Sequence, residues 1–371
     1  MKKICFITAS RSDYGILKNL IFLTKKSKFF RTDIIATGSH FSRSLGNTSE
    51  EIKKDKIEVK HKIKLKESKI DNYKIILNQS SELIEKMSKK LKLVKPDIII
   101  ILGDRFEILF SAYIAFLMNI PIAHIHGGEI TQGSVDNVFR YSISKMSNLH
   151  FVATKRSKKR LIKSEIKKNQ IFHVGSPSIA SIKDIKFKSK GNMEKIFKFK
   201  FLKKNIMVTF HPTTKEKVFY KNQINNLLEA LAKLENVGII FTNPSNDIGN
   251  KYFIKRIKIF IKKRKNAILI SSLGRENYFS CLKIVNVVVG NSSSGIIEAP
   301  SIGCPTLNIG ARQKGREQAM SIINSTYNKD EIFKKLNNIL SHEKKKKYNN
   351  PYFRKYTNEK IFNLIKIYLK K

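Results

Sequence analysis

The sequence has 371 residues, of which 41% are hydrophobic, and its formal net charge is +44. A chain of this length exceeds what one hydrophobic core usually covers, and its apolar content excludes global disorder, so two domains are expected. No apolar run is long and uncharged enough to span a bilayer, and the first residues, MKKICFITASRSDYG, do not resemble a signal peptide, so we predict a cytoplasmic protein without a membrane partner.

The excess of basic residues has two interpretations. It is the kind of charge that a nucleic-acid or membrane-surface binder carries. Alternatively it follows from composition, because Lys, Ile, Asn and Phe are abundant together, as in chains that drift toward AT-rich codons. Much of the lysine lies on predicted helix surfaces without interleaved aromatic residues, so we favour the second interpretation. We expect no nucleic-acid partner and only a weak, salt-sensitive attraction to polyanions.

The first half of the chain alternates predicted strands and helices. The run DIIIILGD is typical of a parallel strand covered on both faces, and NQSSELIEKMSKKLKLVKP has the spacing of an amphipathic helix that ends at Pro96. In chain order, we predict strand 3–8, helix 16–26, strand 30–38, helix 78–96, strand 97–104, helix 106–119, strand 121–128, helix 135–147, strand 149–154 and helix 157–166.

The alternation starts again after the short segment IFHVGSP. The predicted elements there are strand 205–212, helix 220–234, strand 237–244, helix 250–264, strand 267–272, helix 276–285, strand 285–291, a helix after Ser294, strand 305–310 and helix 353–371. Repeated strand–helix units give right-handed crossovers and parallel sheets. We therefore predict an α/β protein with two Rossmann-like domains, residues 1–175 and 176–351, whose parallel sheets face a central cleft.

Polar clusters directly follow nearly every predicted strand of both halves. They are ASRSDYG, GSH, GDRFE, HGGE, HPTTKE, TNPSND and GNSSSG. Ligands of open parallel sheets bind beyond the carboxyl ends of the strands, so these clusters are the candidate binding residues.

The segment GNSSSGIIE, residues 290–298, follows an apolar strand. Ser292 and Ser293 are expected at a helix N-terminus, where amide hydrogens and the helix dipole attract an anion, and Glu298 is placed to accept hydroxyl hydrogens from a ribose. An ordinary serine N-cap explains the same residues equally well. No P-loop is present, and no GxGxxG follows the first strand, which argues against a nicotinamide cofactor. We expect no cofactor.

Charged residues after other strands have similar paired explanations. Arg11 and Arg312 are placed to meet a diphosphate, although Arg11 is also explained by an ion pair with Asp13. Asp104 is a candidate acid or base, or else a helix N-cap, and Arg105 is a substrate contact or a surface charge.

The histidines allow several roles. His124 and His126, with Glu129 and Asp136, form a second polar group, but no third metal ligand is identifiable and we expect no metal. His211 is a phosphate contact or a strand cap. The cysteines, Cys5, Cys281 and Cys304, lie far apart and show neither metal spacing nor a disulfide framework, which suits a reducing cytoplasm.

Taken together, the strings SRSDYGILKNL, TGSHFSRSLGNT, GDRFE, HIHGGE, YSISKMSNLHF, VGSP, HPTT, FTNP and GNSSSGIIEAPSIGCPTLNIGARQKGRE resemble the hydrolysing UDP-N-acetylglucosamine 2-epimerase family. The resemblance covers nearly the whole chain. It implies the GT-B fold, a helix at 352–371 that packs back on the first domain, and an assembly as a homodimer or homotetramer. It also implies conversion of UDP-N-acetylglucosamine to N-acetylmannosamine and UDP, for sialic-acid or related nonulosonic-acid synthesis.

The resemblance also assigns roles to individual residues. Those that match the UDP-binding residues of the family are Arg11, His211, Asn243, Ser292, Ser293, Glu298 and Arg312. His40 matches a sugar-side residue, and Asp104 and Asp136 match acidic residues implicated in catalysis. One position departs from the pattern, because relatives often read HIEGGE where this chain has His126. Either Glu129 takes over the function of that glutamate or His126 acts itself.

The resemblance implies an elimination, because the C2 hydrogen of the sugar has no neighbouring carbonyl and is not acidic. The C1–O bond to UDP breaks as the C2 proton leaves, and water then adds to the resulting glycal. We expect Arg11, Arg312, Ser292 and a protonated His211 to stabilise the diphosphate, and the carboxylates to handle proton and water.

Other functions remain open from the sequence. The same chemistry on a UDP- or GDP-linked diacetamido-trideoxy sugar, on a legionaminic-acid route, is the first alternative. A GT-B glycosyltransferase would share the ribose-binding glutamate but would need an acceptor. The strings HIHGGE and YSISKMSNLHF argue against a non-hydrolysing epimerase.

Overall fold

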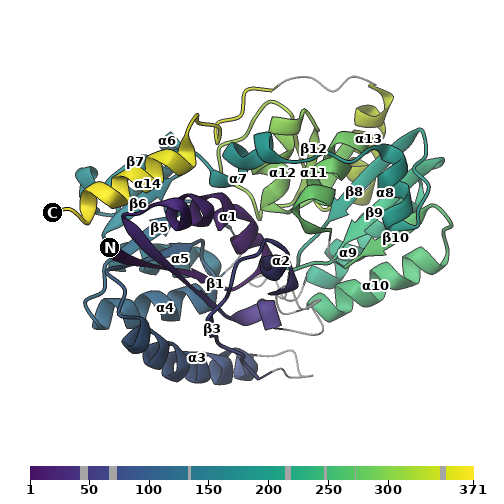
Figure 1. Ribbon diagram of the computed structural model, residues 1–371. Helices are drawn as coiled ribbons and strands as arrows, with labels where there is room; N and C mark the ends of the chain where they lie inside the picture. Colours follow the sequence, from purple (N-terminus) through teal and green to yellow (C-terminus); the bar gives the residue numbers. More distant parts are fainter. Residues whose placement is uncertain are drawn as a thin grey trace. The chain divides into compact units, whose positions relative to one another are not determined.

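The computed structural model describes residues 1–41, 49–66, 73–132, 135–213, 219–245, 249–271, 273–342 and 348–371 (Figure 1). The motifs TGSHFSRSLGNT, HPTTKE and TNPSND lie partly outside the described residues. The chain forms two compact units. The first comprises Met1–Glu129, Asp136–Lys183 and Tyr352–Lys371, and the second comprises Ile130–Val135 and Asp184–Pro351.

The first unit contains a seven-stranded, all-parallel sheet of order β3-β2-β1-β4-β5-β6-β7. Its strands are β1 Lys2–Thr8, β2 Phe30–Ala36, β3 His61–Lys62, β4 Ile98–Leu102, β5 Ile122–Ile125, β6 Leu149–Val152 and β7 Ile171–His173. Its α-helices are α1 Arg11–Lys26, α2 Ser49–Lys54, α3 Tyr73–Val94, α4 Phe106–Leu117, α5 Asp136–Met146, α6 Lys155–Lys163, α7 Pro177–Ala180 and α14 Thr357–Tyr368.

Strand β4 shows why this sheet needs helices on both faces. All five of its residues are buried, and successive side chains of a strand point to opposite faces. Ile98 and Ile100 belong to a core cluster with residues of α1 and α14, whereas Ile99 and Ile101 belong to a cluster with residues of α3, α4 and α5. The continuous apolar run therefore fills two cores, as expected for a parallel strand.

The C-terminal helix α14 belongs to the first unit although it follows the whole second unit in sequence. Its buried residues Ile361 and Ile365 lie in the same core cluster as Leu17 and Leu20 of α1. The ring of Phe362 also meets that of Phe30 edge to face, with ring centres 5.2 Å apart. In Figure 1 this helix lies next to α1.

The second unit contains a six-stranded, all-parallel sheet of order β10-β9-β8-β11-β12-β13. Its strands are β8 Lys204–Thr209, β9 Val237–Thr242, β10 Ala267–Ile270, β11 Val287–Gly290, β12 Thr306–Ile309 and β13 Ile322–Ser325. Its α-helices are α8 Lys190–Phe197, α9 Tyr220–Ala232, α10 Asn250–Lys262, α11 Gly274–Ile284, α12 Ser293–Ile297 and α13 Lys329–Ser341. The described residues of the two units together also include four short 3₁₀ helices, Gly38–Phe41, Lys168–Gln170, Ser181–Asp184 and Ala299–Ile302.

A short segment from the first half of the sequence, residues 130–135, belongs to the second unit. The guanidinium of Arg316 donates to the carbonyl of Ile130 at 2.8 Å and to the hydroxyl of Thr131 at 3.2 Å. The amide of Gln132 donates to the carbonyl of Arg312 at 3.0 Å. The unit boundaries therefore differ from a single division at residue 175, and the main change of unit falls between Lys183 and Asp184.

The predicted α/β class with two parallel sheets is confirmed. The structure also contains strands β3, β7 and β13, which the sequence pattern does not predict. Strands β3 and β7 have three residues or fewer, and β13, IINS, ends in polar residues. Helix α1 begins at Arg11, five residues before the predicted start, because Ser10 caps it.

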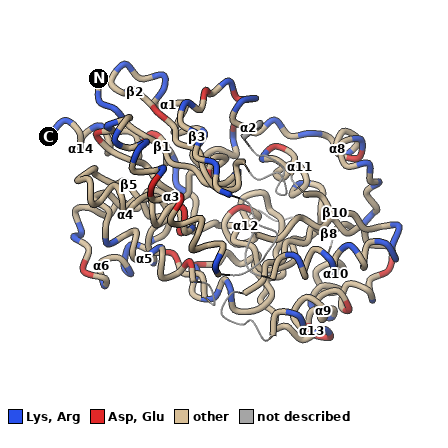
Figure 2. The backbone as a smooth tube through the Cα atoms, turned by 90° about the horizontal axis from the view of Figure 1, so that it is seen from below, with Lys and Arg blue, Asp and Glu red and all other residues tan. Residues whose placement is uncertain are grey.

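No helix in the part of the chain that the structure describes has the length and apolar character needed to cross a membrane. Figure 2 shows Lys and Arg spread over many elements of both units, with Asp and Glu interspersed among them.

Candidate active site

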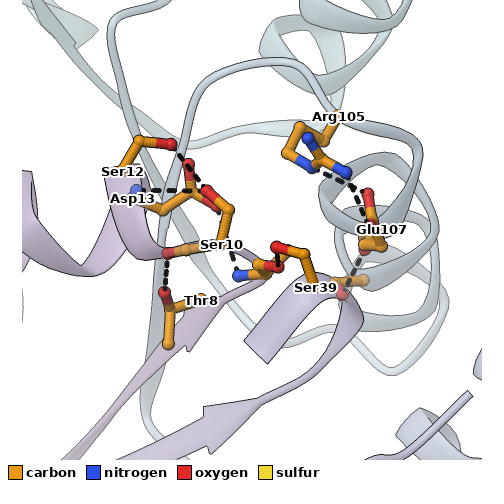
Figure 3. A network of polar contacts seen from close by, with 9 residues as sticks. Thr8, Ser10, Ser12, Asp13, Ser39, Arg105 and Glu107 are labelled. Carbon is orange, nitrogen blue, oxygen red and sulfur yellow. Dashed lines mark hydrogen bonds and ion pairs between the residues drawn. The ribbon is translucent and has the colours of Figure 1, made fainter. Parts of the chain in front are cut away.

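The carboxyl end of β1 is tied to the start of α1 and to the segment after β2 (Figure 3). Ser10 accepts a hydrogen bond from the amide of Asp13, and the Asp13 carboxylate accepts one from the amide of Ala9 at 3.2 Å. His40 is fully buried, with Nε2 2.9 Å from the hydroxyl of Thr8. This network fixes the backbone that precedes the predicted anion contact Arg11, which is half-buried as the first residue of α1.

Arg105 and Glu107 form a second part of the same network (Figure 3). Arg105 donates to both carboxylate oxygens of Glu107, from Nε at 3.1 Å and from a terminal nitrogen at 3.0 Å. Glu107 is 2% exposed, so the pair orients the guanidinium. Arg105 is therefore a paired, half-buried group rather than an isolated surface charge. Burial raises the pKa of nearby Asp13 to about 6, and Arg105 opposes that shift.

Asp104 follows β4 and is held by a buried arginine that the sequence did not single out. Arg140 of α5 donates to the Asp104 carboxylate and, at 2.8 Å, to the backbone carbonyl of Glu129. The side chain of Arg140 is 5% exposed and that of Asp104 is 18% exposed. Asp104 is therefore an oriented carboxylate that solvent still reaches, and it does not cap α4, whose N-cap is Arg105.

His124 and His126 have separate partners, and neither arrangement resembles a metal site. His124 Nε2 lies 2.8 Å from the carbonyl of Gly103, which only accepts, so Nε2 carries the proton and Nδ1 accepts from the hydroxyl of Ser144 at 3.0 Å. His126 has its Nε2 3.0 Å from the hydroxyl of Ser176. Within the described ranges, no group of three or more His, Cys, Asp or Glu is placed to hold a metal ion.

We expect the protein to lose stability as pH falls from about 6.5 toward about 4. Burial lowers the pKa of His124 to about 3 and that of His150 to about 4, so the unfolded chain binds more protons in this window and stability rises with pH. Asp13 acts in the opposite sense: because its folded pKa is raised to about 6, its contribution is lost as pH rises toward that value. Because two histidines act in one direction and one carboxyl in the other, the free energy of unfolding should fall as pH falls through this window.

The matched variant is His124→Gln, which removes one titrating ring. It should reduce the slope of unfolding free energy against pH, with the reduction rising toward about 1.4 kcal/mol per unit, the value for one proton, as pH falls below about 6. Urea unfolding at about pH 7, about pH 6 and about pH 5 measures that slope. Equal slopes for the two proteins would show that His124 is not held neutral.

Glu129 and Asp136, the other two carboxylates predicted in the first unit, differ in environment. Glu129 is 1% exposed, and its oxygens accept hydrogen bonds from Ser157 at 2.5 Å and from Tyr352 at 3.4 Å. Asp136 is the half-buried first residue of α5. Of the two, Asp136 is the one that solvent reaches.

His211 of the second unit is neutral in this structure, which corrects the expectation of a protonated ring. Its Nδ1 accepts a hydrogen bond from the amide of Ser245 at 2.8 Å, so the proton is on Nε2. Burial, with Arg312 nearby, lowers the pKa of His211 well below its ordinary value. A neutral ring still offers one N–H donor to an anion.

Asn291, which the sequence did not single out within GNSSSG, joins the ends of β8, β11 and β12. Its side chain accepts from the amide of His211 at 2.7 Å and donates to the carbonyl of His211 at 2.9 Å. Its own carbonyl accepts from Arg312 at 3.2 Å and from Gln313 at 2.7 Å. Asn291 is fully buried, so it fixes His211 and Arg312 relative to each other. The only hint in the sequence is an amide at the end of a buried strand.

Strands β8 and β11 approach so closely here that Gly290 is required. It has a φ of +131°, and a Cβ at this position would lie 2.0 Å from the carbonyl oxygen of Thr209. Ser292 then caps α12, as predicted, through a 3.4 Å bond from the amide of Ser294.

The remaining predicted residues of the second unit also follow strands. Ser293 is the first residue of α12, and Glu298 is the C-cap residue of this five-residue helix. Glu298 lies close to Tyr278, whose pKa is raised well above its ordinary value by burial and further by Glu298. Asn243 follows β9 and is half-buried. Each predicted residue of this unit thus lies at a strand's carboxyl end or in the helix after it.

Comparison with known proteins identifies relatives over the whole chain. The family model described as UDP-N-acetylglucosamine 2-epimerase matches residues 23–366. The GDP/UDP-N,N'-diacetylbacillosamine 2-epimerase (hydrolyzing) of Campylobacter jejuni is 38% identical, over 90% of this chain and 87% of its own. The UDP-N,N'-diacetylbacillosamine 2-epimerase (hydrolyzing) of Legionella pneumophila is 33% identical, over 99% and 96%.

Two further comparisons agree with these. The polysialic acid biosynthesis protein P7 of Escherichia coli is 33% identical, over 100% of this chain and 95% of its own. The crystal structure of UDP-GlcNAc 2-epimerase from Neisseria meningitidis bound to UDP-GlcNAc covers 100% of both chains with a TM-score of 0.82 and 19% identity, which shows a common fold. Fold and family resemblance are both confirmed: this chain belongs to the UDP-N-acetylglucosamine 2-epimerase family.

Proposed function

We propose that this protein is a hydrolysing sugar-nucleotide 2-epimerase whose substrate is a UDP- or GDP-linked diacetamido-trideoxy sugar. The proposal rests on the 38% identity to a Campylobacter jejuni protein named for this reaction, and the Legionella pneumophila relative named for it supports the same choice. UDP-N-acetylglucosamine, the first expectation from the sequence, becomes the second candidate. It is favoured by the match to a polysialic acid biosynthesis protein.

The proposed reaction has two steps whose atoms balance. In the first, a base takes the C2 proton while the C1–O bond breaks, so that UDP or GDP leaves and a glycal forms. In the second, water adds its oxygen to C1, and a proton returns to the opposite face of C2. The product is the free manno-configured sugar. The first step places growing negative charge on the diphosphate, and the residues that face this charge have the largest effect on its rate.

The second unit supplies the groups that we assign to the diphosphate. Arg312 is held by Asn291, and Ser292 offers a hydroxyl at the N-terminus of α12. The neutral ring of His211 donates from Nε2 rather than acting as a cation. Donors fixed in advance lose little reorganisation energy when the charge develops. Asn243 and Glu298 are assigned to the nucleoside part.

The first unit supplies the groups that we assign to the sugar and to proton transfer. Asp104 is the leading candidate for the C2 base, because Arg140 orients its carboxylate and leaves it partly exposed. Asp136 is assigned to the water or to reprotonation. Arg11, His40 and Arg105 are assigned to substrate contacts near the sugar and diphosphate. We propose that no metal or cofactor takes part.

The choice of substrate predicts an ordering of specificity constants. We expect kcat/KM for the diacetamido-trideoxy sugar nucleotide to exceed that for UDP-N-acetylglucosamine by at least about tenfold, since one well-placed polar group in a site changes discrimination by this much or more. Nuclear magnetic resonance of the released sugar, with UDP- and GDP-linked forms compared side by side, measures it. Faster turnover of UDP-N-acetylglucosamine would select the second candidate.

Two finer expectations accompany this function. A glycosyltransferase of the same fold would release no nucleotide without an acceptor, whereas this protein should release it from the donor alone. We further propose that the protein works in the cytoplasm, as a homodimer or homotetramer.

A further inference from the structure

We propose that Glu129 is a positioning residue, which anchors two of the places where the chain passes between its two units, and that it is not the C2 base. This inference rests on the proposed function for its kinetic consequences. His126 stands where relatives often have a glutamate, and the proposal implies that Glu129 does not take over the function of that glutamate.

The position of Glu129 in the chain is the first observation. Glu129 is the last residue of its segment in the first unit, and Ile130 begins the short segment of the second unit. Tyr352 is the first residue of the C-terminal segment of the first unit, and Pro351 ends the second unit. Glu129 and Tyr352 are 223 residues apart in sequence, yet the Tyr352 hydroxyl donates to Glu129 Oε2 at 3.4 Å. This one hydrogen bond therefore joins two crossings, the points after Glu129 and before Tyr352 where the chain passes between the units.

The burial of Glu129 is the second observation. Glu129 is 1% exposed, and Ser157 and Tyr352, its hydroxyl partners, are both fully buried. The Ser157 hydroxyl donates to Oε1 at 2.5 Å, so each carboxylate oxygen has a donor within the first unit. A general base must lie within hydrogen-bond reach of the proton it takes. Asp104, with 18% of its side chain exposed, meets this requirement better.

The neighbours of Glu129 extend the anchor. The amide of Ser176 donates to the carbonyl of Tyr352 at 2.9 Å, and the Ser176 hydroxyl lies 3.0 Å from Nε2 of His126. His126 is thus linked through Ser176 to the same residue, Tyr352, that Glu129 contacts directly. Of the polar side chains in the motif HIHGGE, those of His126 and Glu129 therefore belong to this cluster, whereas His124 contacts Gly103 and Ser144.

Gly128 shows that this close approach is built into the backbone. It has a φ of +72°, and a Cβ at this position would lie 2.5 Å from the carbonyl oxygen of Ser157. The Arg160 guanidinium also donates to the Gly128 carbonyl at 3.3 Å. The second glycine of HIHGGE therefore lets the segment lie against α6, where Ser157 reaches the Glu129 carboxylate.

Glu129→Gln separates the two roles. Glutamine keeps the shape of the side chain, accepts from Ser157 and donates to the Tyr352 oxygen, but it cannot take a proton from C2. We expect kcat/KM to fall by less than about tenfold with an unmoved pH profile, whereas removal of a general base costs about 10²- to 10⁴-fold. Glu129→Ala removes the anchor and should raise KM about tenfold at a temperature where circular dichroism shows it folded.

Tyr352→Phe is the independent variant, and Tyr356→Phe is its matched control. Tyr356 lies in the same segment and is 65% exposed, so its hydroxyl has no place in the buried cluster. Tyr352→Phe should raise KM, as Glu129→Ala does. In both variants, hydrogen exchange of peptides covering residues 126–130 and 350–354 should be faster than in the parent protein. The Tyr356→Phe protein should match the parent protein in each measurement.

Two results would overturn the proposal. One is a loss of more than about 10²-fold in kcat for Glu129→Gln with KM unchanged, which would make Glu129 the base. The other is a Glu129→Ala protein with a lower melting temperature but unchanged KM and exchange, which would make its role one of stability alone. If the parent protein turns over neither sugar nucleotide, the proposed function fails, and the exchange measurements still decide whether Glu129 anchors the crossings.

Discussion

Asp104→Asn is expected to lower kcat by about 10³-fold while changing the dissociation constant for UDP by less than about threefold, within the range that loss of a general base produces. The carboxylate lies beyond β4, where Arg140 orients it and leaves it partly exposed. Asparagine can still accept the hydrogen bond from Arg140, so the site keeps its shape. It cannot accept the C2 proton, so the chemical step loses its base.

Arg312→Ala is the contrasting variant for this experiment. It removes a guanidinium that Asn291 holds in place, and charge-assisted contacts to phosphate are among the stronger hydrogen bonds. UDP affinity should therefore fall by about 10²-fold, an effect of about 2.7 kcal/mol. Single-turnover kinetics and calorimetric titration with UDP separate the two patterns. An Asp104→Asn protein that turns over normally, or that loses UDP affinity as Arg312→Ala does, would remove Asp104 from the role of base.

The local pattern of the sequence predicts the fold class and most of the strands. The continuous apolar run at β4 and the polar clusters after the strands depend only on neighbouring residues, so they predict parallel sheets and the places where ligand-binding residues follow. Ser292 capping α12 was predictable for the same reason.

Contacts between distant elements were not predictable in this way. Arg140 reaches Asp104 across 36 residues, and in sequence it is one of many basic residues on an amphipathic helix. Asn291 likewise acts through His211, 80 residues away. The neutral state of His211 depends on an amide from Ser245, in a different strand–helix unit. Such side chains acquire their roles only when the sheet brings the ends of its strands together.

The division into units illustrates the same limit. Residues 130–135 belong to the second unit, and Arg316 and Arg312 bond to the backbone of Ile130 and Gln132, yet nothing in the composition of this segment marks a boundary. The sequence pattern detects where the alternation of strands and helices restarts, and it does not detect a short segment that leaves one unit and returns.

We expect UDP or GDP to depart by an elimination that leaves a double bond between C1 and C2 of the sugar. Turnover of the diacetamido-trideoxy sugar nucleotide in heavy water, followed by proton nuclear magnetic resonance, tests it directly. The proton that returns to C2 comes from solvent and is added to the face opposite the one that lost its proton. The released manno-configured sugar should therefore carry deuterium at C2 and lack the C2 proton signal. A released sugar that keeps its original C2 proton would contradict the account, since direct hydrolysis never breaks the C2–H bond.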